Sequence, residues 1–280
     1  MTDHSQIPHL MRLLDDASES VRAHAFGQIL RMGDDPEAVA APYLDALTPQ
    51  QRTIFRNLLA QHRQEGVWRE AWLAWPDLVP ICPQLEEAFR LLAQFQYGWQ
   101  PPVHLADLLD DLADGFLASG RPRDALGLSR YLFVSQKFQG DAENYYDPLN
   151  SNLIHVIEKR RGLPISLCAV FMLVGARVGI EVYGCNVPRH FLARAEVNNE
   201  DLLFDCFHGG RVLTRDERNS LRDSLSPNLA YLLVEAPSAP EIILRVLNNL
   251  VDASEQVNDT AQAVLMRDLM RDLHMRMHSG

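Results

Sequence analysis

Apolar residues recur at three- and four-residue spacing through the first half of the chain, a period that predicts α-helices. The first stripe covers residues 10–30, and a Gly-Asp-Asp-Pro segment at 33–36 ends it. Similar stripes over residues 85–95, 105–117 and 124–134 predict further helices. We therefore expect the N-terminal half to be helical.

A capping box marks where another helix begins. Thr48 and Gln51 have the spacing that lets each side chain bond the other's backbone, and Pro49 stands at the first helical position. We expect this helix to end near Gly66. Residues 10–33 resemble a single HEAT-type unit, but stacked arrays normally need at least three copies, so a plain helical bundle explains them equally well.

After residue 179 the period changes to the alternation that is typical of strands. Residues 180–187, 190–197 and 201–207 each predict one strand. Asn198 and Asn199 lie between the last two strands, and asparagine tolerates the positive φ that a two-residue turn requires. The pattern therefore predicts an antiparallel hairpin.

The hairpin register brings a histidine close to an aspartate. If Val197 pairs with Glu200, Leu192 lies opposite Asp205, and His190 lies on the same face as Asp205. We expect Asp205 to accept a hydrogen bond from the His190 ring, which is how papain-like and transglutaminase-like enzymes orient an imidazole. A structural histidine with satisfied hydrogen bonds is the alternative.

The apolar segment 163–178 predicts a helix that is buried nearly all round. Gly162 and Pro164 suit an exposed N-terminus, where free N–H groups lower the pKa of a thiol. A nucleophile would stand in that first turn. The segment contains Ser166 and, one turn further in, Cys168, whose apolar neighbours predict an unreactive thiol.

The loop over residues 140–152 is rich in turn formers and contains the sequence NYYDPLNSN. A surface connection is the commoner role of such a loop, but a loop beside a site can also line a cleft. The candidate cleft-lining residues are Tyr145, Tyr146, Asp147, Asn150, Pro164 and Ser166.

A metal site is a weaker interpretation of the same region. Cys185, His190, Cys206 and His208 would suit zinc by type. Strand alternation, however, predicts Cys206 and His208 on the face opposite His190. We therefore expect neither a metal nor a cofactor.

The charge balance bears on partners. With 26 basic and 37 acidic side chains the net charge is −11, which disfavours nucleic acid or an anionic membrane as the partner. The start of the chain is polar and acidic, unlike an export signal. The four cysteines form no regular framework, so we expect reduced thiols and a cytoplasmic protein.

Several long motifs occur in one order: YYDPLNSNLIHVIEKRRGLPISL, VPRHFLARAE, LLFDCFHGG and ILRVLNNL. Through them, residues 85–249 resemble the SirB-like family of transglutaminase-core proteins. The resemblance implies an α+β fold, in which helices pack on a small antiparallel sheet in a papain-like core. We expect a helical, HEAT-like N-terminal region over 1–84, this core over 85–236, and a C-terminal helical hairpin over 237–280.

The resemblance carries over only part of a catalytic triad. His190 matches the family's histidine and Asp205 its aspartate, whereas the position of the nucleophilic cysteine falls on Pro164. We therefore expect a non-catalytic domain that binds a peptide or protein partner through the old cleft. The alternative is a cysteine-dependent hydrolase or acyltransferase that uses Cys168, His190 and Asp205.

Overall fold

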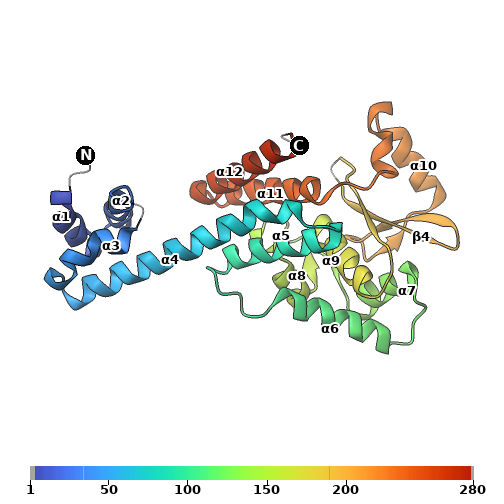
Figure 1. Cartoon of the computed structure of the whole chain (residues 1–280). Helices are drawn as coiled ribbons and strands as arrows, with labels where there is room; N and C mark the ends of the chain where they lie inside the picture. Colours follow the sequence, from blue (N-terminus) through green and yellow to red (C-terminus); the bar gives the residue numbers. More distant parts are fainter. Residues whose placement is uncertain (1–3, 34, 189, 279–280) are drawn as a thin grey trace. The chain divides into compact units, whose positions relative to one another are not determined.

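The computed structural model describes residues 4–33, 35–188 and 190–278. The described chain divides into two compact units, with the boundary between Glu70 and Ala71, inside helix α4 (Figure 1). The three-part division predicted from the sequence stays a prediction.

In the described residues of the first unit, all regular secondary structure is helical. Its buried core includes Ile7, Met11 and Leu14, together with Ile29 and Phe55. The helices that contribute to this unit are η1 (His4–Gln6), α1 (Ile7–Arg12), η2 (Leu13–Asp15), α2 (Glu19–Leu30), α3 (Pro36–Ala40), η3 (Ala41–Ala46) and α4 (Pro49–Ala74).

Helix α4 begins where the capping box predicts. The Gln51 backbone N–H donates to Thr48 Oγ1 over 3.2 Å, and the Thr48 N–H donates to Gln51 Oε1 over 3.1 Å. The predicted end near Gly66 is wrong, because α4 continues to Ala74. A helix tolerates one glycine at a cost of about 1 kcal/mol, and here neither a proline nor a left-handed cap follows Gly66 to stop it.

The second unit contains the sheets and most of the helices. Its central helix, α9, is buried along nearly its whole length and packs against α5, α6, α8 and the sheet. The helices of this unit are η4 (Trp75–Asp77), α5 (Ile81–Gln96), α6 (Leu105–Ala118), α7 (Ala125–Ser129), the π-helical η5 (Arg130–Ser135), η6 (Pro148–Ser151), α8 (Leu153–Lys159), α9 (Pro164–Arg177), α10 (Arg215–Ser224), η7 (Pro227–Leu233), α11 (Ala239–Gln256) and α12 (Thr260–Met277).

The larger sheet of the described chain has four antiparallel strands in the order β3, β4, β5, β6. Val197 pairs with Glu200 as predicted, and Asn198 and Asn199 have φ values of 52° and 63° at the turn. The strands are shorter than the predicted segments. Their bounds are β3 (Tyr183–Cys185), β4 (Leu192–Val197), β5 (Glu200–Asp205) and β6 (Arg211–Val212); a separate parallel pair joins β1 (Gln139–Gly140) and β2 (Arg161–Gly162).

Both faces of this sheet are covered. Phe204 of β5 meets Phe171 of α9 edge to face, with ring centroids 5.4 Å apart. On the other face, Leu192 and Leu203 are buried with Leu221 of α10 packed against them. The fold is therefore α+β, and helices α9 and α10 pack on opposite faces of the β4–β5 hairpin.

None of the helices in the described residues combines the length and apolar character that a membrane crossing requires.

Candidate functional site

Asp205, the last residue of β5, is the centre of the candidate site. Its side chain is only 5% exposed, and each carboxylate oxygen faces a histidine. His190 Nε2 lies 3.3 Å from Oδ1, and His208 Nδ1 lies 2.8 Å from Oδ2. The His208 backbone N–H also donates to Oδ1, over 3.2 Å. The structure thus brings His190 and Asp205 together, as the register predicts, and adds His208.

These contacts keep a buried carboxylate charged. Burial raises the pKa of Asp205, but the hydrogen bonds from His190 and His208 outweigh it and hold the pKa at about 2. Because Asp205 faces Nε2 of His190, Nδ1 is the ring nitrogen that remains to face another group. The catalytic role of the pair stays a prediction.

Helix α11 fixes the segment that leads to His190. Arg245 donates to Asn186 Oδ1 over 2.5 Å and to the Val187 carbonyl over 2.8 Å. The His190 N–H donates to that same Val187 carbonyl over 3.1 Å. Arg245 also lies over the Phe191 ring, 5.6 Å from its centroid. The ILRVLNNL motif therefore supplies a positioning residue for the histidine.

A tight turn brings His208 back over Asp205. The prediction that His208 lies on the face opposite His190 is wrong, because β5 ends at Asp205 and strand alternation ends with it. Gly209 and Gly210 follow with φ values of 75° and 66°, and Ser129 Oγ donates to the Gly210 carbonyl over 2.8 Å. The HGG sequence was the signal for this turn, because successive glycines permit such a reversal.

Cys168 lies in the core beneath the site. It is fully buried, and its thiol lies 3.6 Å from the Phe191 carbonyl, to which it donates. Burial, and then the neighbouring Cys206 thiol, raise the pKa of Cys168 well above its ordinary value. Cys168 therefore lacks the exposure and the thiolate character of a nucleophile.

Three predicted cleft residues are buried as well. Asn150 is 1% exposed and its side chain donates to the Asn144 carbonyl over 2.7 Å. Ser166 Oγ donates to the Asn150 carbonyl over 2.7 Å, and Pro164 is buried at the start of α9. These residues attach the 144–152 loop to α9.

Tyr145 and Tyr146 remain accessible, at 39% and 52% exposure. Their rings contact each other, and the Tyr145 ring lies 6.1 Å from that of Phe207, the neighbour of His208. Asp147 and both tyrosines border a hollow of about 20 Å³, which has room for about one water molecule. The aromatic pair therefore lies beside the Asp205 cluster as an exposed rim.

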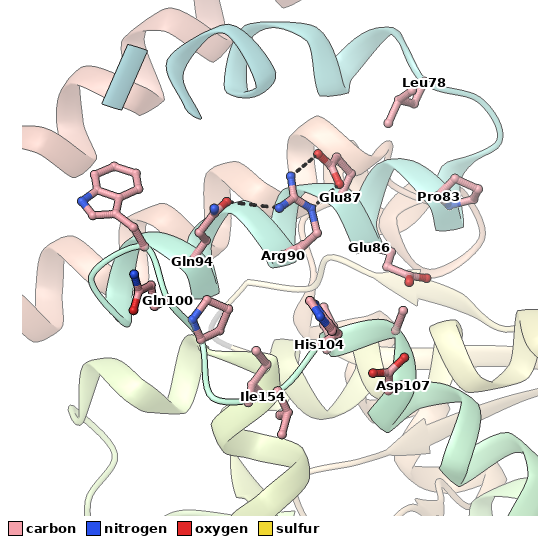
Figure 2. A pocket seen from close by; sticks show the side chains of 15 residues that line it. Leu78, Pro83, Glu86, Glu87, Arg90, Gln94, Gln100, His104, Asp107 and Ile154 are labelled. Atoms are coloured by element: carbon pink, nitrogen blue, oxygen red, sulfur yellow. Dashed lines mark hydrogen bonds and ion pairs between the residues drawn. The ribbon is translucent and has the colours of Figure 1, made fainter. Parts of the chain in front are cut away.

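A larger hollow of about 850 Å³ lies away from this cluster, between α5 and the segment 99–107 (Figure 2). Arg90 projects into it but donates to both oxygens of Glu87, over 2.7 and 2.6 Å, and to Gln94 over 3.1 Å. The Arg90 guanidinium is thus paired with Glu87 in the lining of the hollow, so we do not assign an anion-binding site to it. Sequence reasoning missed this hollow because its lining residues share no motif.

The sequence pattern of the transglutaminase-like superfamily matches residues 104–248, half of the chain and the whole Asp205 cluster. The chain belongs to the transglutaminase-like superfamily. The transglutaminase-like match also covers α9, with Pro164 at its first position, and the aromatic rim.

Relatives of known name share this region. A UPF0162 protein of Xylella fastidiosa strain Temecula1 is 38% identical over 198 residues, covering 63% of this chain and 68% of the relative. Another, from strain 9a5c, is 36% identical over 157 residues, 52% of this chain and 54% of the relative. F-box only protein 21 of Homo sapiens is 26% identical over 155 residues, which cover 52% of this chain and 24% of that protein. The comparison with solved structures gives no significant match.

Proposed function

We propose that this transglutaminase-like domain binds a peptide or protein segment at the rim of a degenerate active site, without acyl transfer, in the cytoplasm. Within the superfamily we assign it to the SirB-like group. The observation that carries the proposal is the start of α9, where the resemblance puts the nucleophile on Pro164 and where Cys168, one turn further in, is fully buried.

The state of Cys168 argues against the cysteine-dependent alternative. Acyl transfer by a cysteine requires a thiolate within reach of both the base and the substrate. The thiol of Cys168 instead donates to a backbone carbonyl in the core, and burial raises its pKa. The contact between His190 and Asp205 is the feature that favours the alternative.

The rim supports partner binding through its chemistry. Tyrosine combines a large apolar face with a hydroxyl, and tyrosines are enriched where proteins contact each other. Tyr145 and Tyr146 stand exposed beside His208, whose side chain is 61% exposed. The four thiols are free, consistent with a reducing compartment. The recurrence of this region as about a quarter of F-box only protein 21 suits a module that is joined to other parts.

A photo-crosslinking amino acid at position 146 tests the binding surface in the native host. Val264 is the matched control, because its exposure of 52% equals that of Tyr146. We expect a discrete adduct from position 146, none from position 264, and loss of the adduct when Tyr145→Ala is added. Equal adducts from both positions, or none from either, would count against the rim as a binding surface.

An activity measurement separates the two functions. In hydrolase and transamidase assays, His190→Ala should give the same background as the wild type, since no reaction depends on it. The variant should lose roughly 1–3 kcal/mol of unfolding free energy or partner affinity, because Asp205 loses a buried donor. A wild-type turnover that falls by orders of magnitude in His190→Ala would support the enzyme instead.

A further inference from the structure

Three metal-ligating side chains converge at the end of β5. One ligand atom from each of His190, Asp205 and His208 lies within 4.8 Å of the other two. We propose that these residues form a binding site for a divalent first-row transition ion, with Zn²⁺ as the best match. The proposal does not depend on partner binding at the rim, because it concerns only the affinity of the protein for the ion.

The donor set determines the class of ion. Two imidazoles and one carboxylate suit Zn²⁺ and its first-row neighbours, whereas Mg²⁺ and Ca²⁺ prefer all-oxygen ligands. Zinc sites with three protein ligands keep a fourth position for water or another ligand. Here that position can face solvent, because the His208 and His190 side chains are 61% and 30% exposed.

The distances already approach those of a coordination sphere. Ligand atoms about 2.0–2.1 Å from a tetrahedral ion lie about 3.3 Å from one another. His190 Nε2 lies 3.3 Å from Asp205 Oδ1, and His208 Nδ1 lies 2.8 Å from Oδ2. These two distances run to different oxygens of Asp205, so an ion would replace the His–Asp contacts once the three side chains draw closer together.

The backbone around the ligands is fixed in advance. Ser129 holds the turn that carries His208, and Arg245 holds the segment that leads to His190. Asp205 is anchored by the His208 backbone N–H at 3.2 Å. Outer contacts of this kind orient metal ligands and contribute to affinity. Three ligand-type residues that met on the surface by chance would not be expected to have such supporting contacts.

The charge of the site also suits a cation. The carboxylate of Asp205 gives an incoming ion an anionic ligand beside the two imidazole nitrogens. Arg211 is a nearby cation, with Nη2 3.7 Å from Asp205 Oδ2, but its Nη1 forms a 2.6 Å contact with Glu217. The Arg211–Glu217 ion pair can therefore hold the guanidinium away from a bound ion.

The same contacts could serve only to satisfy a buried carboxylate, so the test must measure the ion directly. Calorimetric titration of chelator-treated protein with Zn²⁺ gives stoichiometry and affinity, and the visible absorption of added Co²⁺ reports the coordination number. His274 and His278 stack at the C-terminal end of α12, with ring centroids 6.5 Å apart, and could bind zinc weakly by themselves. The titrations therefore use the His274→Ala/His278→Ala protein as the parent.

We expect one Zn²⁺ per chain in this parent. His208→Ala and His190→Ala should each weaken binding at least about 100-fold, because each removes a ligand. His155→Ala, outside the cluster, is the control and should leave the affinity unchanged. Urea unfolding would confirm that His208→Ala still folds, which its exposed position favours.

Nuclear magnetic resonance gives a reading that needs no ligand variant. On addition of Zn²⁺ to the parent, the ring signals of His190 and His208 should shift together and saturate at one equivalent. A parent that binds no Zn²⁺, or one whose binding survives His208→Ala without shifts at His190, would overturn the proposal. Loss of partner crosslinking at position 146 would not affect it.

Discussion

Asp205 keeps its charge in the core because two histidine rings and one backbone N–H face its carboxylate. A buried carboxylate without partners would take up a proton instead. Donors from His190 and His208, and the His208 backbone, reverse that tendency. The electrostatics of the site at residue scale therefore depend on two histidines, of which only His190 was expected from the sequence.

The low pKa of Asp205 predicts that the protein loses stability at acid pH. Its folded pKa of about 2 lies below the ordinary value of 3.8, so its stabilisation is fully present above about pH 4 and is lost as the pH falls towards 2. The difference corresponds to roughly 2 kcal/mol. Urea unfolding measures the free energy of unfolding of the wild type and of Asp205→Asn. The difference between the two proteins should shrink by roughly 2 kcal/mol as the pH falls from about 4 to 2. A difference that is constant with pH would contradict the assignment.

Burial predicts slow alkylation of Cys168. In the native protein at neutral pH, iodoacetamide should modify Cys168 no faster than Cys206, which is equally buried, because low exposure and a raised pKa both suppress thiolate chemistry. Cys82, which is partly exposed, should react first. Mass spectrometry of timed samples measures all of them at once. Fast labelling of Cys168 that disappears in His190→Ala would indicate an activated thiol.

The turn after β5 contains two adjacent glycines, Gly209 and Gly210, which have similar φ values but different surroundings. A Cβ at Gly209 would meet open space, whereas one at Gly210 would lie 2.1 Å from the ring of Phe133. Phe133 is buried against Phe171 of α9, with centroids 5.8 Å apart, so it has little freedom to move. The two positions therefore form a matched pair.

Gly209→Ala should cost about 1–2 kcal/mol, the strain of alanine at positive φ. Gly210→Ala carries the same strain and a clash with a packed ring, so its cost should reach roughly 3 kcal/mol or more. Urea unfolding of both variants measures the difference. Equal costs would mean that Phe133 moves aside, and the turn would then be less constrained than its contacts indicate.

The elements also show what the sequence could and could not predict. The hairpin register was predictable because Asn198 and Asn199 permit one tight turn, and that turn fixes which residues pair. Strand alternation predicts the wrong face for His208, because the strand ladder ends at Asp205. A helix end near Gly66 is a wrong prediction, because a lone glycine does not stop a helix and α4 continues to Ala74. The hollow beside α5 depends on how α5, the segment 99–107 that follows it and Ile154 of α8 pack together, which no local pattern encodes.

For the whole molecule, the open question is where the second folding unit begins. Compactness places the boundary between Glu70 and Ala71, whereas the family resemblance predicted a core that starts at residue 85. The segment between these limits is not a linker. It contains the first turn of α5 and two buried tryptophans, Trp72 and Trp75. These are 2% and 1% exposed, and their ring centroids lie 5.9 Å apart.

Two fragments decide between these boundaries. Residues 71–280 should unfold cooperatively and keep the His190 and His208 signals of the full chain, because the fragment retains its own core. Residues 85–280 should lose at least about 3 kcal/mol, since removing a buried tryptophan alone costs that much and here two are lost with the start of a helix. Urea unfolding, with nuclear magnetic resonance spectra of both fragments, measures this. If the 85–280 fragment is as stable as the 71–280 fragment, Trp72 and Trp75 belong energetically to the N-terminal region, and the boundary predicted from the sequence describes the folding unit better than compactness does.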